Sequence, residues 1–299
     1  MGRAIGRLLL CAWAGLALWM PEASAYIEPV DGVTHFEETV AYDGRNRHAL
    51  YFRPTAASTT RAPLLVLLHY RGGDGEAMNY LTQASLLVRD FGIWVVLPDA
   101  KNQNWNHDPA DTGRVDDVAW LSHLIDSAVA RFPVDGKKVT MAGLSDGGFM
   151  AMRFACERPQ KVAAVAAVAA TFLKKLERVC QPSLGTPFLM INGTGDERTK
   201  YDSTWGVLTV PASAARWAQI DGCPTGPKRT VLPDIAADRT TVVLDTWAAC
   251  AAGEVRLYTV ENGGHTWPGA RRDTLMYGRT SHDFDATLTI WQFLRRFSR

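Results

Sequence analysis

Short apolar stretches that alternate with helical segments limit most strongly what this chain can fold into. Three of these stretches are PLLVLLHY (63–70), IWVVLPD (93–99) and KVTMAGL (138–144). The segment 115–132 lies between the last two, and its apolar residues recur at helical spacing. Strands without polar alternation are buried on both faces, which is typical of a parallel sheet covered by helices. We therefore predict an α/β fold with a mostly parallel central sheet and helices on both of its faces.

The rest of the chain continues this pattern. A strand is predicted over 47–54, a helix over 76–92, and a second helix that begins near Gly147 and must end by Pro159. Further strands are predicted over 162–170, 187–192 and 254–261, and a closing helix over about 285–297. No linker, repeat or low-complexity tract interrupts the pattern, so we expect one catalytic domain over 26–299.

The first 25 residues have the features of an export signal. Two arginines precede an apolar run over 8–20, and the small residues Ala-Ser-Ala follow at 23–25. The run is shorter than the about 20 residues that a membrane-spanning helix needs, which disfavours a retained anchor. We expect cleavage near Ala25, a secreted protein in the periplasm or outside the cell, and no stable membrane association.

The charges of the chain nearly cancel, with 32 Lys and Arg residues against 31 Asp and Glu residues. This balance disfavours nucleic acid or an anionic membrane as a partner. Hydrophobic residues make up 47% of the sequence, which is enough for a sizeable core. These properties indicate an ordinary globular protein and leave its oligomeric state open.

Four cysteines remain after cleavage, and an even number in an exported protein indicates disulfides. Three pairings are possible, and we favour the sequential one, Cys156 with Cys180 and Cys223 with Cys250. Each bond would close a loop of about 25 residues, worth about 3 kcal/mol. The alternative is four buried free thiols. Because no CxxC or HxxxH spacing occurs, we expect no metal site, and no other cofactor is predicted.

The stretch MAGLSDGGFM (141–150) places Ser145 in a G-x-S-x-G motif, with a predicted strand before it and a predicted helix after it. A serine exposed at such a sharp turn needs neighbours without bulk, which explains the glycines. The helix N-terminus offers N–H groups and a positive dipole end for developing negative charge. We interpret Ser145 as a nucleophile, the alternative being a plain glycine-rich bend.

A serine hydroxyl becomes an effective nucleophile when a histidine accepts its proton and a carboxylate holds that histidine's tautomer. In this fold the chain order is serine, acid, histidine. His265 lies in a Gly-rich loop after the strand 254–261, whereas His282 precedes the last helix as a capping or surface residue. Histidine at a strand end suits a catalytic base, so we predict His265.

Asp196 is the best candidate for the acid because it follows a strand and a glycine turn. Its competitors lie farther from any strong strand, and they are Asp202, Asp221 and Asp234. An oxyanion hole needs two backbone donors, and we predict the amides of Asp146 and Tyr70. Tyr70 lies in the turn LLHYRGGDG, where we expect His69 to be structural and to hydrogen-bond the loop.

Several motifs run in order over most of the chain, namely LLHYRGG, VDDVAWLSHLID, GLSDGGFMA, ACERPQKVAAVAAVAA, NGTGD and GGHTWPG. The sequence resembles the polyhydroxybutyrate (PHB) depolymerase-like esterases of the α/β-hydrolase fold. That family is shared with feruloyl and acetylxylan esterases and includes family 1 carbohydrate-esterase-like proteins. The resemblance implies an α/β-hydrolase whose triad falls on Ser145, Asp196 and His265, and it supports the two sequential disulfides.

The sequence departs from the family pattern at three places. Tyr70 stands where the family usually has glycine, and Asn192 replaces the usual histidine of the acid box. The segment DERTKY (196–201) is more charged than the apolar, proline-containing segment usually found there. None of these changes removes a triad group, but all three leave the substrate open.

The substrate cleft is predicted from polar and aromatic residues, because aromatic faces stack on sugars and aromatic acyl groups. The candidates are Tyr70, Trp105, His107, Trp205 and Trp267. The chain has no linker with a polymer-binding module, which favours soluble or oligomeric esters, such as 3-hydroxybutyrate oligomers or feruloyl and acetyl esters of plant polysaccharides. The alternatives are a non-catalytic binding protein, disfavoured by the intact triad, and a peptidase or lipase, disfavoured because no lid or propeller region is visible.

Overall fold

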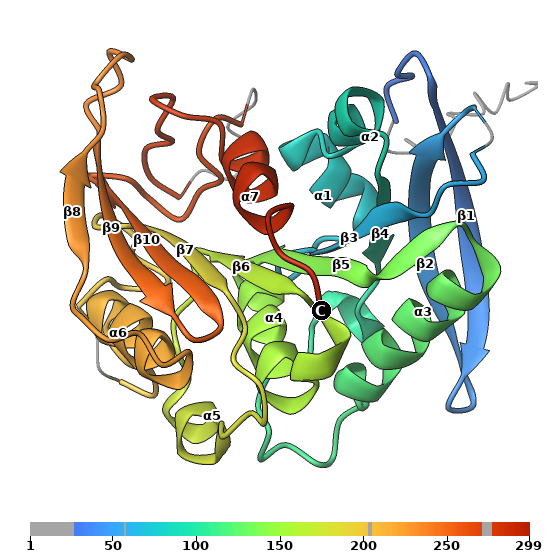
Figure 1. The fold of residues 1–299 in the computed structure, drawn as a ribbon, viewed down its shortest axis with the longest axis horizontal. Helices are drawn as coiled ribbons and strands as arrows, with labels where there is room; N and C mark the ends of the chain where they lie inside the picture. Colours follow the sequence, from blue (N-terminus) through green and yellow to red (C-terminus); the bar gives the residue numbers. More distant parts are fainter. Residues whose placement is uncertain (1–26, 57, 203–204, 271–276) are drawn as a thin grey trace, which may run out of the picture.

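The computed structural model describes residues 27–56, 58–202, 205–270 and 277–299. The predicted export signal and its cleavage position near Ala25 lie outside the described residues. Within them, ten strands form one sheet in the order β1-β2-β4-β3-β5-β6-β7-β10-β9-β8 (Figure 1). The strands are β1 (Val33–Tyr42), β2 (Arg45–Pro54), β3 (Ala62–Leu68), β4 (Trp94–Pro98), β5 (Val134–Leu144), β6 (Ala164–Val168), β7 (Phe188–Gly193), β8 (Lys228–Val231), β9 (Thr241–Cys250) and β10 (Gly253–Glu261).

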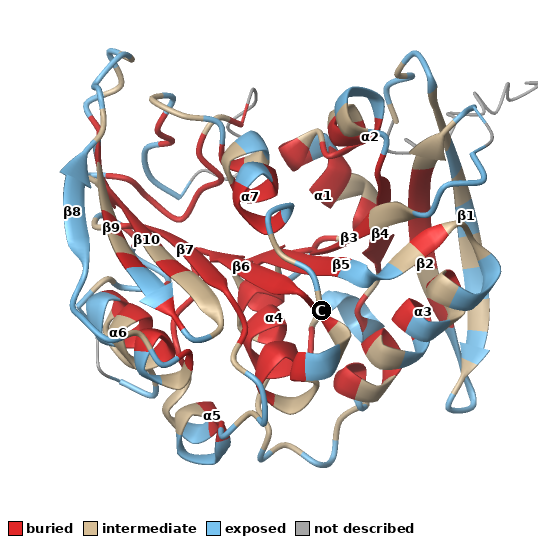
Figure 2. Ribbon diagram, viewed as in Figure 1, coloured by how far each residue is buried: buried red, intermediate tan, exposed pale blue. Residues whose placement is uncertain are grey.

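The middle of the sheet is parallel and its edges are antiparallel. Strands β4, β3, β5, β6, β7 and β10 pair in parallel. At the edges, β1 pairs with β2, β2 with β4, β9 with β10 and β8 with β9, all antiparallel. The central strands carry the apolar runs and are almost wholly buried, as Figure 2 shows. The predicted mostly parallel α/β sheet is confirmed.

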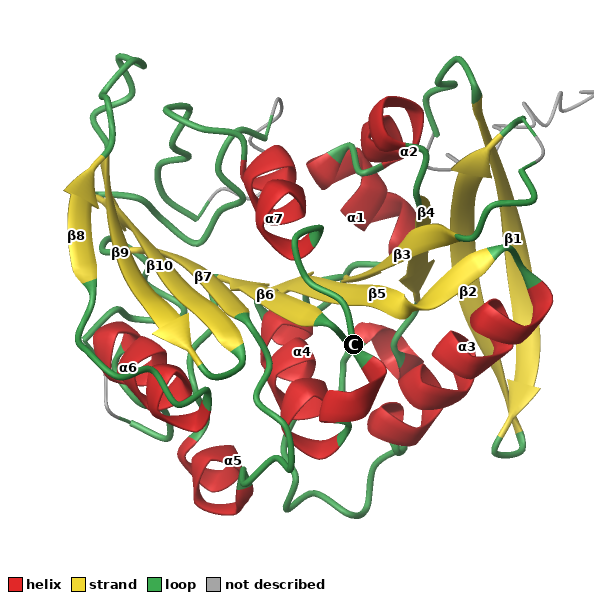
Figure 3. Cartoon of the chain, viewed as in Figure 1, coloured by secondary structure: helices red, strands yellow, loops and turns green. Residues whose placement is uncertain are grey.

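Helices cover both faces of the sheet (Figure 3). One face carries α1 (Gly75–Thr82), α2 (Ser85–Phe91) and α7 (Ala286–Leu294). The other carries α3 (Asp117–Arg131), α4 (Asp146–Glu157), α5 (Lys174–Val179) and α6 (Val210–Ile220). Two 3-10 turns complete the described elements, η1 (Lys101–Gln103) and η2 (Pro159–Lys161). The two faces enclose two buried apolar clusters, one on each side of the sheet.

The helix predicted over 76–92 is two helices, so this prediction is wrong in its extent. Gln83 adopts a left-handed conformation with φ 51° and ends α1, donating its N–H to Asn79 O at 2.6 Å. The Asn79 side chain then accepts the N–H of Ser85, at 3.0 Å, as α2 begins. Because this break depends on one polar side chain reaching across the turn, apolar periodicity did not reveal it.

The structure joins Cys156 to Cys180 and Cys223 to Cys250, with sequence separations of 24 and 27 residues. The first bond connects α4 to the end of α5, and the second connects the end of α6 to the end of β9. Both therefore fasten helices of one face to the C-terminal half of the fold. In the described ranges, no helix combines the length and apolar character needed to cross a membrane.

Candidate active site

Ser145 occupies the turn between β5 and α4 in a backbone conformation that non-glycine residues avoid. Its φ is 54° and its ψ is −116°, which costs on the order of 1–3 kcal/mol of local strain. The turn is held on both sides, since Ser145 N donates to Val168 O at 2.8 Å and Phe149 N donates to Ser145 O at 2.9 Å. Packing and hydrogen bonds thus hold a strained serine at the start of a helix.

The glycines beside Ser145 are required by close backbone approach. A Cβ atom on Gly147 would lie 2.3 Å from Leu68 O at the end of β3. A Cβ atom on Gly143 would lie 2.3 Å from the backbone of Gly147. A side chain at Gly147 would push the turn away from β3, and a side chain at Gly143 would clash within the turn, so both glycines are needed for this close packing.

Asp196 and His265 meet at the carboxyl ends of the neighbouring parallel strands β7 and β10. Asp196 Oδ2 lies 2.8 Å from His265 Nδ1, and both side chains are buried. The other carboxylate oxygen, Oδ1, accepts the N–H groups of Arg198 and Thr199, each at 2.8 Å. The carboxylate is therefore fixed by three donors, and it directs the proton of the imidazole to Nδ1.

The loops that carry this pair are themselves bound together. Gly195 N donates to Gly263 O at 2.8 Å, and a Cβ atom on Gly193 would lie 2.2 Å from the same oxygen. Because Nδ1 of His265 is occupied by Asp196, Nε2 is the nitrogen left to accept a proton. Ser145 lies at the same edge of the sheet, since β5 and β10 are parallel strands separated by β6 and β7.

The loop after β3 approaches this edge and is held by a buried histidine. His69 Nδ1 lies 2.7 Å from Tyr70 O, and His69 Nε2 accepts the Ala100 N–H at 2.9 Å. Burial lowers the pKa of His69, which keeps the imidazole neutral. The prediction that His69 hydrogen-bonds this loop is confirmed.

Of the two predicted oxyanion donors, Asp146 directly follows Ser145, and Tyr70 lies in the loop that follows β3. Asp146 is the first residue of α4, so its N–H is among the first-turn amides that have no acceptor within the helix. Tyr70 covers Gly73, where an added Cβ atom would lie 3.2 Å from the tyrosine ring. Burial raises the pKa of Tyr70, with smaller contributions from Asp74 and Tyr277.

The side chain of Asp146 has a structural role that the sequence analysis did not predict. Its carboxylate is buried, and Oδ2 accepts the Trp105 N–H at 2.8 Å. Oδ1 lies 2.9 Å from His107 Nδ1 and 3.4 Å from Arg71 Nη2. Burial raises the pKa of Asp146, but His107, the Trp105 amide and Arg71 outweigh it and hold the pKa below its usual range. The sequence signal for this role is a single acidic residue among the otherwise uncharged residues of GLSDGGFM (143–150).

Comparison with known proteins indicates the type of reaction. The family described as esterase PHB depolymerase matches residues 46–177. The chain is 28% identical over 266 residues to a protein of Nocardia uniformis subsp. tsuyamanensis named as an esterase, NocK, covering 81% of this chain and 76% of that protein. It is 26% identical to feruloyl esterase B of Piromyces equi, covering 68% of this chain but only 39% of that longer protein. The chain is a carboxylic ester hydrolase that is similar to the PHB depolymerase esterases over residues 46–177.

A solved structure supports the fold of this esterase independently. The acetyl xylan esterase from Aspergillus awamori superposes with a TM-score of 0.61 at 15% identity, covering 78% of this chain and 94% of that chain. At this identity the likeness concerns the fold alone, and it identifies the α/β-hydrolase architecture. Among the described residues of the esterase, no group of three or more His, Cys, Asp or Glu side chains is placed to hold a metal ion.

The predicted cleft residues have different environments. Trp105 is fully buried, and its Nε1 donates to His69 O at 2.9 Å. The prediction that Trp105 lines a cleft is wrong, because packing behind the β3 loop uses its whole ring. His107 keeps 17% of its side chain exposed, with its ring 5.3 Å from that of Phe149. Trp205 is 92% exposed, and His282 is exposed as predicted.

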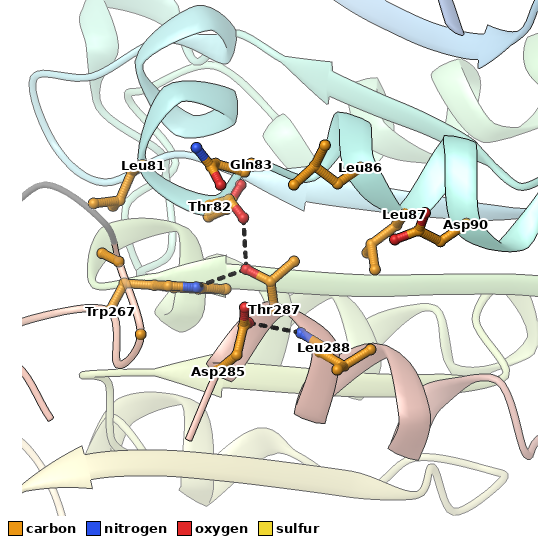
Figure 4. A pocket seen from close by; sticks show the side chains of 12 residues that line it. Leu81, Thr82, Gln83, Leu86, Leu87, Asp90, Trp267, Asp285, Thr287 and Leu288 are labelled. Atoms are coloured by element: carbon orange, nitrogen blue, oxygen red, sulfur yellow. Dashed lines mark hydrogen bonds between the residues drawn. The ribbon is translucent and has the colours of Figure 1, made fainter. Parts of the chain in front are cut away.

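Trp267 is buried at the edge of a small pocket between α1, α2 and α7 (Figure 4). None of Ser145, Asp196 and His265 lines this pocket. Thr287 also lines this pocket. Its hydroxyl accepts the Trp267 Nε1–H at 2.9 Å and donates to Thr82 O at 2.7 Å. Trp267 follows His265 by two residues, so Thr287 fastens the loop of the histidine to the end of α1.

Replacing Thr287 with valine keeps the shape of the side chain but removes both hydrogen bonds. We expect the unfolding free energy to fall by about 1–3 kcal/mol, because the indole N–H and the Thr82 carbonyl lose their partner in a buried place. Urea unfolding monitored by fluorescence measures this change. Thr287→Ser retains the hydroxyl and serves as the control. Equal stability of Thr287→Val and the wild type would show that these two hydrogen bonds do not fasten the loop.

Proposed function

We propose that this protein is an exported serine esterase that hydrolyses its ester through an acyl-enzyme on Ser145. The observation that carries the proposal is the strained backbone of Ser145 at the β5–α4 turn. Strain of this kind persists only where the surrounding structure enforces it, and it gathers at active sites. The buried contact between Asp196 and His265 supports the same assignment by supplying an oriented base at the same sheet edge.

In the first half of the reaction, His265 Nε2 accepts the hydroxyl proton of Ser145 while Ser145 Oγ bonds to the ester carbonyl carbon. The amides of Tyr70 and Asp146 stabilise the oxyanion that forms. The imidazolium, held by Asp196, then gives its proton to the leaving alcohol oxygen as the carbon–oxygen bond breaks. Water repeats these steps in the second half, releasing the acid and restoring the serine.

Export is part of the proposal. The signal and the cleavage near Ala25 predicted from the sequence favour it, and so do the two disulfides, which persist in oxidising compartments. We propose that residues 26–299 act as a single catalytic domain in the periplasm or outside the cell. No cofactor is needed for this chemistry.

The substrate class proposed is a soluble or oligomeric carboxylic ester. Feruloyl esterase B and the acetyl xylan esterase support plant cell-wall esters as one class, and the PHB depolymerase family supports hydroxyalkanoate oligomers as another. Tyr70 and His107, both partly exposed, are the described candidates for contact with the substrate near Ser145. Trp205 and Trp267 are not supported in this role by any described contact with the proposed triad.

The direct experiment is covalent labelling. The purified protein should hydrolyse p-nitrophenyl acetate, and a fluorophosphonate should stop this activity while adding its mass to one peptide. We expect mass spectrometry of the digested protein to place the adduct on Ser145. The Ser145→Ala protein, treated in the same way, is the matched control. An adduct on another serine together with lost activity would refute the assignment of the nucleophile.

A further inference from the structure

Arg198 lies beside the proposed base, in the charged segment that departs from the family pattern. Its guanidinium carbon lies 3.7 Å from the centre of the Tyr277 ring. The Tyr277 ring in turn packs edge-on against His265, with 6.3 Å between the ring centres. The guanidinium therefore lies within about 10 Å of the imidazole that acts on the substrate.

In the part of the chain that the structure describes, no acidic side chain neutralises the charge of Arg198. The carboxylate of Asp196 is taken up by His265 and by backbone amides. Glu197, the other acid of this segment, pairs with Lys200 at 3.4 Å. No described carboxylate forms an ion pair with Arg198, whose side chain is exposed. An exposed cation that lies over an aromatic ring is restrained before it meets an anion, which favours binding.

The position of Arg198 selects one half of the ester. His265 donates its proton to the leaving oxygen, so the alcohol half of the substrate must lie on the His265 side of the site. Arg198 is on that side. Arg71, by contrast, follows Tyr70 on the oxyanion loop and already lies 3.4 Å from the Asp146 carboxylate. Among the described residues, Arg198 is the cation that stacks on the Tyr277 ring beside His265, and we therefore consider it for an anionic alcohol half.

We propose that Arg198 binds a carboxylate on the alcohol half of the ester, so that the preferred substrates are esters of hydroxy acids with a free carboxyl group. This inference rests on the proposed esterase activity. In an ester of a 3-hydroxy acid the carboxylate lies a few bonds from the leaving oxygen, on the order of 4–5 Å, which is within the reach of Arg198. Guanidinium and carboxylate also match as bidentate partners. Acyl transfer to Ser145, with a proton from His265 to the leaving oxygen, would release one hydroxy acid from the acid end of an oligomer.

The test compares two substrates with the same internal ester, the linear dimer of 3-hydroxybutyrate with its free carboxylate and the uncharged methyl ester of that dimer. Release of 3-hydroxybutyrate or its methyl ester is followed by chromatography, and kcat and KM are determined for each. We expect the wild type to prefer the free acid by about tenfold or more in kcat/KM, mainly through a lower KM. Arg198→Gln should remove about tenfold of this preference, and Arg198→Lys should restore part of it. Lys200→Gln changes a cation of the same segment and should leave the preference intact.

Two results would overturn the inference while leaving the proposed function in place. One is equal kcat/KM of the wild type for the acid and the methyl ester. The other is an unchanged preference in Arg198→Gln, which would mean that another group reads the charge. The first result uses the wild type alone and so does not depend on the fold of a variant, and Arg198→Lys checks the fold behind the second. Failure to hydrolyse p-nitrophenyl acetate would instead overturn the proposed function and, with it, this inference.

Discussion

Ser145→Ala is expected to lower kcat for p-nitrophenyl acetate by about 10⁴-fold or more, because alanine leaves no oxygen to form the acyl-enzyme. The amides of Tyr70 and Asp146 would remain, so a small residual rate above that of water is expected. Steady-state kinetics of the purified variant measures the loss. Activity within tenfold of the wild type would exclude Ser145 as the nucleophile.

A second variant at the same position separates catalysis from strain. Glycine adopts a positive φ without the Cβ penalty, so Ser145→Gly should raise the unfolding free energy by about 1 kcal/mol or more while losing the same activity. Alanine carries the same Cβ as serine and should leave stability nearly unchanged. Denaturant unfolding of the three proteins makes the comparison. A Ser145→Gly protein less stable than Ser145→Ala would contradict the idea that the fold holds this residue under strain.

Asp196→Asn is expected to lower kcat/KM by about 10³- to 10⁴-fold at neutral pH. The asparagine amide would still meet His265 Nδ1, but it would donate to that nitrogen through its N–H instead of accepting from it. The imidazole proton would then shift to Nε2, the nitrogen that must accept the proton of Ser145. The geometry would survive while the wrong tautomer blocked the reaction.

The pH profile of kcat/KM, with circular dichroism to check the fold, tests this prediction. Asp202→Asn is the matched control, because Asp202 is an exposed acid of the same loop region that competed with Asp196 in the sequence. We expect this control to keep the activity of the wild type. Similar losses in the two variants would show that the region, and not the contact between Asp196 and His265, is what matters.

Local sequence patterns predicted much of the fold. The apolar runs predicted the buried central strands because a strand covered on both faces excludes polar side chains. They did not reveal β1, which is an edge strand whose residues alternate between half-buried and exposed positions. Nor did they reveal β8, whose residues are all exposed. An edge strand is specified by its one neighbour, and that information is not in its own composition.

The same division holds at the candidate site. The motif around Ser145 and the chain order of serine, aspartate and histidine are local features of strand ends, so the sequence brought Asp196 and His265 forward as partners before their 2.8 Å contact was known. The sequence did not predict that Trp105 is buried, because aromatic residues occur both in cores and in clefts. The contact of Trp105 with the loop after β3 decides between a core and a cleft position.

The sequence by itself thus determined the parallel core, the strand–helix turn that carries Ser145 and the residues proposed for the triad, since each depends on short-range spacing of apolar, glycine and polar residues. Tertiary structure alone decided which groups the side chains of Asp146 and Arg198 contact. The buried carboxylate of Asp146 contacts two loops, through Arg71 in one and Trp105 and His107 in the other, and Arg198 lies on Tyr277, which is 79 positions later in the chain. Contacts of this range are set by how the strand-end loops pack against each other, and no local pattern encodes that packing.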